Sequence, residues 1–266
     1  MRHQDTTFVA NGNPLIRYKY TADPGALVDR DGTMYIYAGH DICPPPHNYY
    51  KIDDWLVFSS KDLQTWTEHK VPLRATDFSW ATGEAWASQV IRKGGSYYWY
   101  VTVEHKAEDE KGGKAIGVAV SDSPTGPFTW TNVKDINPLA DPNGKLVDYA
   151  SQHVSNSIDP DVIRDEVTGD YYLFWGSFGS DSGIWAIQLT SDGLAIAPGA
   201  EKVFIAYDLE GTYVHYKNGY YYCFGSKGSC CEGAESTYHV VVGRSKNVLG
   251  PYEGKDGNLM STRNSA

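Results

Sequence analysis

One pattern of apolar and polar positions recurs four times along the chain. Each copy has an apolar stretch, a polar turn that contains glycine, and a stretch rich in aromatic residues. β-branched and aromatic runs around a glycine-bearing turn are typical of β-hairpins. The four predicted hairpins span residues 26–37, 89–101, 161–175 and 213–224. The outer strands of three copies are predicted to begin at residues 62–66, 126–128 and 250–252.

The spacing of the four copies predicts a β-propeller. Units of about 40–50 residues with four strands are typical of propeller blades. Loop insertions at residues 43–50 and 139–157 account for the longer spacings, and residues 1–19 are expected to add a strand or two. An irregular β-sandwich is the weaker alternative, because it does not require the same pattern in the same order. We therefore predict an all-β propeller with four full blades evident, in a single domain spanning residues 1–266.

Composition and charge exclude several classes of protein. Aromatic residues make up 14% of the 266 residues, which argues against a disordered chain. The 23 basic and 33 acidic residues give a net charge of −10, which disfavours nucleic acid as a partner. No apolar run is long enough to span a membrane. The N-terminus lacks the pattern of a secretory signal, so the protein either stays inside the cell or was exported with its signal removed.

The four cysteines suggest no cross-linked framework. Cys43, Cys223, Cys230 and Cys231 are too few and too irregularly spaced for a disulfide scaffold or a zinc site. Adjacent cysteines rarely pair with each other. We expect reduced, packed thiols.

Three acidic residues stand at equivalent places, just before or at the first strand of a repeat. They are Asp23, Asp159 and Glu210. The innermost strand of every blade runs beside the central channel, so we expect the three carboxyl groups to meet at one face. Crowding makes one carboxyl group keep its proton while another stays ionised, and glycosidic cleavage needs both states. An Asp-Pro pair alone can be a turn former, but the matched positions favour a function.

These residues resemble glycoside hydrolase family 43. Ala-Asp-Pro at Asp23, Ile-Asp-Pro at Asp159 and Leu-Glu-Gly at Glu210 are similar to the three acids of that family. The resemblance implies a five-bladed propeller that inverts the anomeric centre of arabinofuranosides and xylosides. It further implies that Asp23 is the general base, that Glu210 is the general acid, and that Asp159 orients the acid and tunes its pKa.

Other motifs extend the resemblance over roughly residues 14–260. They include Trp86-Ala87-Ser88-Gln89 and the segments 116–119 and 123–127. Gly228-Ser229-Cys230-Cys231, followed by Ser236-Thr237-Tyr238, is similar to the arabinanase and arabinofuranosidase branches.

The chain departs from the family at its C-terminal end, where family members carry a fifth blade with a Gly-His element near a metal-linked water. No such segment is found, so a C-terminal fifth blade is expected to be missing. Because a strand edge would then be uncovered, we predict a homo-oligomer or low stability. No cofactor is expected to be required, although the family's channel calcium is a candidate ion with a structural or electrostatic role.

Six further residues are candidates for binding a sugar: His40, Trp80, Trp86, Asn156, Cys230 and Arg244. A tryptophan face can stack on a sugar ring, although core packing is the alternative for Trp80 and Trp86. His40 can equally be a structural histidine, and Arg244 a salt-bridge partner. Cys230 and Cys231 are expected on the pocket wall near Glu210.

The predicted function is an inverting glycoside hydrolase. We expect an exo-acting α-L-arabinofuranosidase or β-xylosidase that removes sugars from plant hemicellulose or arabinan, because the insertion at residues 43–50 would block one end of a cleft. An endo-α-1,5-L-arabinanase is the alternative that the Ser-Cys-Cys sequence supports. A catalytically inactive carbohydrate-binding propeller is a second alternative. A protein-interaction propeller is less favoured, because it has no use for acids gathered at the channel.

Overall fold

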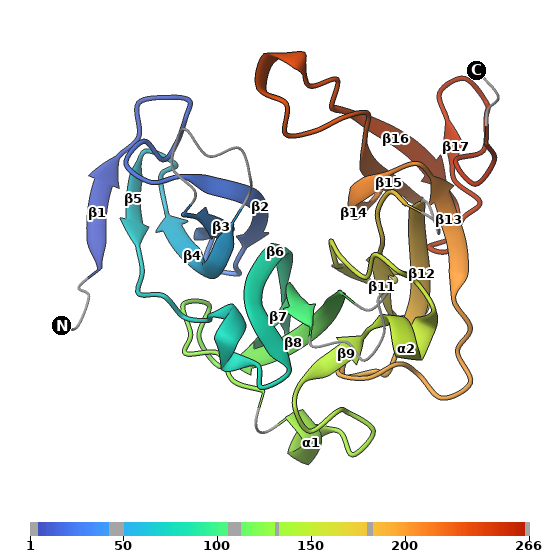
Figure 1. The fold of residues 1–266 in the computed structure, drawn as a ribbon, viewed down its shortest axis with the longest axis horizontal. Coiled ribbons are helices and arrows are strands. Elements are labelled where there is room, and N and C mark those ends of the chain that lie inside the picture. Colours follow the sequence, from blue (N-terminus) through green and yellow to red (C-terminus); the bar gives the residue numbers. More distant parts are fainter. Residues whose placement is uncertain (1–4, 43–50, 106–112, 131–132, 180–182, 264–266) are drawn as a thin grey trace.

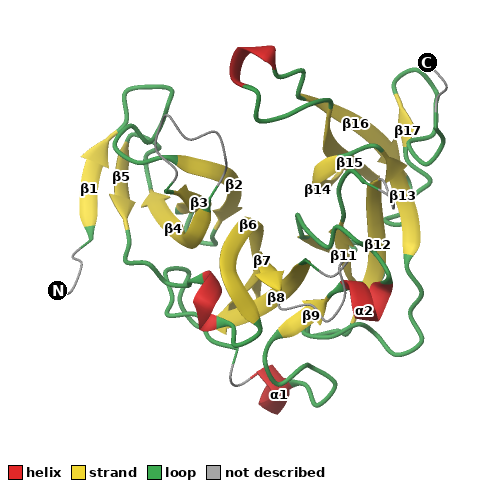
Figure 2. Cartoon of the chain, viewed as in Figure 1, coloured by secondary structure: helices red, strands yellow, loops and turns green. Residues whose placement is uncertain are grey.

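A computed structural model describes residues 5–42, 51–105, 113–130, 133–179 and 183–263. The insertion at residues 43–50 lies outside them. Helical structure in these residues is limited to four short elements (Figure 2): α1 (Val133–Ile136), α2 (Tyr149–Gln152), and the 3-10 turns η1 (Ala75–Asp77) and η2 (Gly233–Glu235). No helix in this part of the chain is long and apolar enough to cross a membrane.

The strands form four antiparallel sheets. The first has the order β1-β5-β4-β3-β2, with β1 (Thr6–Val9), β2 (Thr21–Val28), β3 (Met34–Asp41), β4 (Ile52–Ser60) and β5 (Thr65–Glu68). The second runs β6-β7-β8-β9, with β6 (Ala81–Lys93), β7 (Ser96–His105), β8 (Lys114–Ser121) and β9 (Lys145–Val147). The third runs from β10 to β13, with β10 (Asp161–Arg164), β11 (Tyr171–Trp175), β12 (Gly183–Leu189) and β13 (Val203–Tyr207). The fourth runs from β14 to β17, with β14 (Glu210–Lys217), β15 (Tyr220–Lys227), β16 (His239–Ser245) and β17 (Glu253–Gly254).

The four sheets are the blades of a propeller. Figure 1 shows them in chain order around a centre, with β2, β6 and β14 nearest to it and β1, β9, β13 and β17 farther out. The strand β2 contacts β6, and β10 contacts both β6 and β14. The all-β propeller with four blades is therefore confirmed.

Of the outer strands, the sequence predicted the N-terminal addition correctly and the outer strand of the second blade incorrectly. The N-terminal segment adds one strand, β1, which pairs with β5 and places Phe8 opposite Trp66. The outer strand of the second blade was predicted at residues 126–128. This prediction was wrong, since the outer strand of that blade is β9. Pro127 has no N–H to donate to a ladder, and Phe128 is buried against Trp99 instead.

The aromatic strands β7 and β11 are buried on both faces, which explains their composition. In β7, Tyr97 and Trp99 pack towards the first blade, while Tyr98 and Tyr100 pack towards the third. Successive side chains of a strand point to opposite faces, so consecutive aromatic residues fill two inter-blade cores. Two of these rings in β7 satisfy their buried polar atoms: Trp99 Nε1 donates to Ser88 Oγ at 2.9 Å, and the Tyr100 hydroxyl donates to the Gly193 carbonyl at 2.8 Å.

Side chains also join neighbouring inner strands across the blades. The Val162 N–H donates to Gln89 Oε1 at 2.6 Å, which links β10 to β6. The Val214 N–H donates to Asp161 Oδ2 at 2.6 Å, which links β14 to β10. Burial raises the pKa of Asp161 to about 7, although hydrogen bonds to Asp161 from the Val214 N–H and from the Gln89 side chain oppose the shift. These links fix how the leading ends of the inner strands lie relative to one another.

Replacing Gln89 by alanine is expected to lower the free energy of unfolding by about 1–3 kcal/mol. The substitution leaves the Val162 N–H without its acceptor at the junction of the second and third blades. Urea denaturation monitored by tryptophan fluorescence measures the effect. The matched control is Gln64→Ala on the exposed surface. Equal losses in the two variants would show that the inter-blade link contributes nothing.

Candidate active site

The leading ends of three inner strands carry a β-bulge. The pairing register shifts between Ala22 and Gly25 in β2, between Ala85 and Ser88 in β6, and between Glu210 and Tyr213 in β14. A bulge bends its strand and turns a side chain away from the regular pleat. Asp23 in β2 and Trp86 in β6 therefore occupy equivalent positions in neighbouring blades.

The backbone is left-handed at or directly next to each of the three acids. Asp23 has a φ of 50° and Asp159 a φ of 55°, and Gly211, directly after Glu210, has a φ of 61°. Such values are uncommon outside glycine, although aspartate tolerates them better than most residues. Strained backbone of this kind clusters at functional sites, where the surrounding structure holds it in place.

Asp159 is the centre of a carboxylate cluster. Its Oδ2 accepts a hydrogen bond from the Gly211 N–H at 3.0 Å, and its own N–H donates to Thr102 Oγ1 at 3.1 Å. Burial, followed by the charges of Asp23 and Glu210, raises the pKa of Asp159 to about 8. The structure thus brings together the three acids that the sequence singled out, and their cluster keeps a proton at neutral pH.

Two hydroxyl groups hold the half-buried carboxyl group of Glu210. The Ser177 hydroxyl donates to Oε2, and the Tyr238 hydroxyl donates to Oε1 at 2.9 Å. Asn156, one of the predicted sugar-binding residues, donates from Nδ2 to the Phe178 carbonyl and so fixes the segment that carries Ser177. Its amide nitrogen is therefore engaged with the protein's own backbone.

Trp86 lies beside the cluster together with a lysine. Lys114 Nζ lies 5.0 Å from the centre of the Trp86 ring, and its charge acts on Asp159, where it opposes the rise in pKa. Trp55 Nε1 donates to the Trp86 carbonyl at 2.9 Å, which anchors the bulge. Trp86 is half-buried, and its role in binding a sugar stays a prediction.

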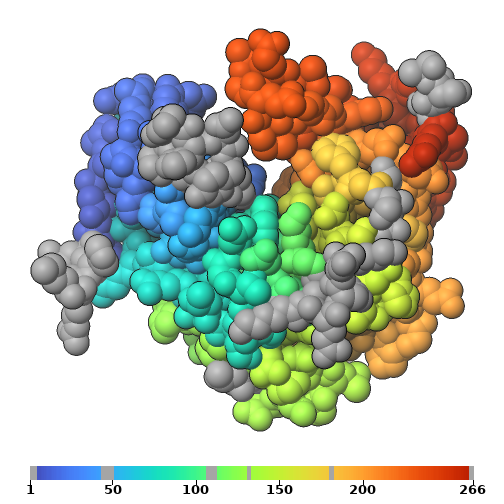
Figure 3. Space-filling model, in the orientation of Figure 1, coloured from blue at the N-terminus to red at the C-terminus, as the bar shows by residue number. Residues whose placement is uncertain are grey.

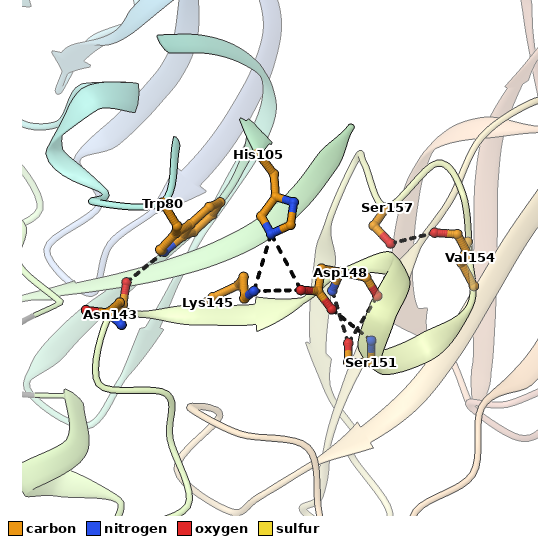
Figure 4. Close-up of polar contacts among 8 residues, drawn as sticks. All are labelled: Trp80, His105, Asn143, Lys145, Asp148, Ser151, Val154 and Ser157. Atoms are coloured by element: carbon orange, nitrogen blue, oxygen red, sulfur yellow. Dashed lines mark hydrogen bonds and ion pairs between the residues drawn. The ribbon is translucent and has the colours of Figure 1, made fainter. Parts of the chain in front are cut away.

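Trp80 lies in a different environment. Its Nε1 donates to the Asn143 carbonyl at 2.9 Å, and its ring lies edge-on to His105 (Figure 4). The ring also packs against Phe78. His105 adjoins an ion pair in which Lys145 Nζ lies 2.6 Å from Asp148 Oδ2. These contacts favour the packing interpretation of Trp80.

His40 and Arg244 also make contacts with the protein itself. His40 Nδ1 lies 2.9 Å from Asp54 Oδ1, and His40 pairs with Thr21, two residues before Asp23. Arg244 lies over the ring of Tyr220, with 4.8 Å to its centre. It pairs with Tyr222, whereas Glu210 pairs with Ser226 at the other end of β15. His40 is thus near the acids in register, and Arg244 is not.

Cys230 and Cys231 form a disulfide between adjacent residues, so the expectation of reduced thiols was wrong for this pair. The bond lies in the loop between β15 and β16, where Cys231 has a left-handed φ of 68°. A tight turn of the loop brings the two sulfurs together. The sequence did not predict this bond, because adjacent cysteines rarely pair. Cys223 is free and buried, as expected, and Cys43 lies outside the described residues.

The described residues contain no group of three or more His, Cys, Asp or Glu side chains placed to share a metal ion. The calcium ion that the resemblance implies therefore finds no set of three such side chains among the described residues. Calcium stays a prediction, and no chemical step below involves a metal.

Sequence reasoning missed several residues of the site. Ser177, Lys114 and Thr102 stand in strands or turns that gave no chemical signal. Tyr238 belonged to a motif that carried the resemblance, but it was given no role. They approach the acids from the second and third strands of a blade and from connecting loops, which the pattern of inner strands does not reveal.

Fold and site together define a class: a β-propeller that presents clustered carboxyl groups at the leading ends of its inner strands. The model of glycosyl hydrolases family 43 matches residues 11–266. The chain belongs to this family.

Three curated relatives illustrate the range of the family. A xylosidase/arabinosidase of Humicola insolens is 36% identical over 66% of this chain and 47% of its own length. An extracellular exo-α-(1→5)-L-arabinofuranosidase of Cellvibrio japonicus is 31% identical over 77% of this chain and 62% of its own. An extracellular endo-α-(1→5)-L-arabinanase of Bacillus subtilis is 32% identical over 77% and 61%. The chain thus spans between 47% and 62% of the length of these relatives.

Solved structures of the family share the fold. A β-xylosidase/α-arabinofuranosidase from a compost metagenome, in complex with xylotriose, has a TM-score of 0.69 and 26% identity, covering 94% of this chain and 81% of its own. An α-L-arabinanase of Cellvibrio cellulosa, in complex with arabinohexaose, has a TM-score of 0.66 and 25% identity, covering 91% and 76%.

Proposed function

We propose that this protein hydrolyses O-glycosidic bonds of arabinose- or xylose-containing polysaccharides with inversion at the anomeric carbon. The carboxylate cluster carries the proposal: the Gly211 N–H, directly after Glu210, donates to Asp159 Oδ2, and the charges of Asp23 and Glu210 both act on Asp159, so the three acids lie at one site. Membership of the family and the names of the relatives give the class of bond and sugar.

In the proposed reaction, Glu210 donates its proton to the oxygen of the departing sugar as the glycosidic C–O bond breaks. Asp23 accepts a proton from the water that attacks the anomeric carbon from the opposite face, and the new C–O bond forms with inverted configuration. Asp159 retains a proton within the cluster and, through the Gly211 N–H, fixes the backbone next to Glu210.

For the substrate, we propose exo-acting removal of α-L-arabinofuranosyl or β-D-xylosyl residues. Two of the relatives named above bear such names. Endo-cleavage of arabinan is the second candidate, which an endo-arabinanase among the relatives and the Ser-Cys-Cys sequence favour. A propeller that only binds carbohydrate is the third, and it predicts heat on titration with arabino- or xylo-oligosaccharides without any turnover.

The test uses nitrophenyl α-L-arabinofuranoside, nitrophenyl β-D-xyloside and linear arabinan. We expect release of nitrophenol from at least one glycoside, and loss of this activity by about 10³-fold in Asp23→Ala. Proton NMR of the first product should show the anomer opposite to that of the substrate. Retention of configuration, or an Asp23→Ala variant as active as the parent, would contradict the proposed roles.

A further inference from the structure

Tyr238 reaches the proposed acid from outside the inner strands. It precedes β16, at the end of the β15–β16 loop, which Figure 3 shows as an orange lobe projecting from the fourth blade. Its hydroxyl donates to Glu210 Oε1 at 2.9 Å, although 41% of the residue is exposed to solvent. An exposed side chain makes a fixed contact only where other groups hold it.

The hydroxyl group of Tyr238 has a second polar partner besides Glu210. Ser226 also hydrogen-bonds the Tyr238 hydroxyl. Both hydroxyls gather at Gly211, where an added Cβ would lie 3.5 Å from Ser226 Oγ and 3.9 Å from the Tyr238 oxygen. Burial, and then the charge of Glu210, raises the pKa of Tyr238 well above its ordinary value, so the phenol stays a donor.

The loop is cross-linked next to Tyr238. The Thr237 N–H donates to the Ser229 carbonyl at 3.0 Å, and the Ser229 N–H donates to Thr237 Oγ1 at 2.9 Å. The Cys230–Cys231 disulfide follows directly. The two hydrogen bonds close the base of the loop, so Tyr238 is held by the loop as well as by the sheet. The disulfide joins adjacent residues and stiffens the backbone only at that turn.

We propose that Tyr238 is a positioning residue for Glu210, orienting the carboxyl group so that its proton points at the leaving oxygen; this inference rests on the proposed function. Each carboxyl oxygen has two acceptor positions. Ser177 occupies one on Oε2 and Tyr238 one on Oε1, so the plane of the carboxyl group is fixed from both sides. After proton donation, the same two hydroxyls stabilise the carboxylate that remains.

The test is Tyr238→Phe, assayed with phenyl and 2,4-dinitrophenyl glycosides of whichever sugar the parent protein cleaves. A poor leaving group needs its departing oxygen protonated, whereas dinitrophenolate departs without help. We expect kcat for the phenyl glycoside to fall roughly 10- to 100-fold, as for loss of a hydrogen bond to a charged group. For the dinitrophenyl glycoside, kcat should stay within about threefold of the parent, and KM should hardly change for either.

The control is Tyr220→Phe, at the opposite end of β15. It should cleave both glycosides like the parent, and thermal melting of both variants checks folding. Equal slowing of both glycosides by Tyr238→Phe, or no slowing, would overturn the positioning role while leaving the proposed function intact. If the parent cleaves no glycoside at all, the proposed function fails first, and the inference falls with it.

Discussion

Glu210→Gln is expected to lower kcat for arabinan or xylo-oligosaccharides by about 10³-fold or more. Glutamine is nearly the same shape but cannot donate the proton that a departing sugar oxygen requires. The loss should depend on the leaving group in the same sense as for Tyr238→Phe, but with a larger amplitude. A 2,4-dinitrophenyl glycoside should retain most of its rate. Steady-state kinetics with a series of aryl glycosides measures this dependence.

Asp23→Asn is the matched comparison for Glu210→Gln. A general base acts on the attacking water, so its loss should slow good and poor leaving groups by similar factors. The two variants would then separate the acid from the base without reference to any other enzyme. If Asp23→Asn were the variant that depends on the leaving group, the two roles would be exchanged.

The strands and the acids were predictable from sequence because both repeat. In β7, four consecutive aromatic residues signalled a strand buried on both faces, and the structure places them in two cores. Asp23, Asp159 and Glu210 stood at matched points of the repeat, and the propeller geometry brought them together. The outer strand β9 was missed because three residues after a long connection carry no periodicity.

The remaining parts of the site depend on contacts that no local pattern encodes. Ser177 reaches Glu210 from a turn after β11, and Tyr238 reaches it from a loop. The disulfide of Cys230 and Cys231 depends on a left-handed turn at Cys231. Repetition identifies equivalent positions in different blades, but it says nothing of side chains that only one blade supplies.

Asp159→Asn is expected to increase stability at alkaline pH while lowering activity by about 100-fold or more. The pKa of Asp159 is raised from its ordinary value of 3.8 to about 8, first by burial and then by Asp23 and Glu210. Between these two pH values the unfolded chain releases the proton while the folded protein keeps it. Stability of the parent therefore falls as pH rises from about 4 to 8. Asparagine stays neutral, so the variant does not lose this contribution.

Thermal melts of the parent and Asp159→Asn at pH 4 and pH 9 test the sign. The difference in Tm should be small at pH 4 and should favour the variant at pH 9, by roughly 2–4 °C for each kcal/mol. Asp161 titrates in both proteins, so it does not contribute to the difference between them. The exposed Asp135→Asn variant is the control and should follow the parent at both pH values. If Asp159→Asn gained no more at pH 9 than at pH 4, burial and the neighbouring carboxyl groups would not raise the pKa of Asp159, and the proton that the proposed reaction assigns to Asp159 would be absent.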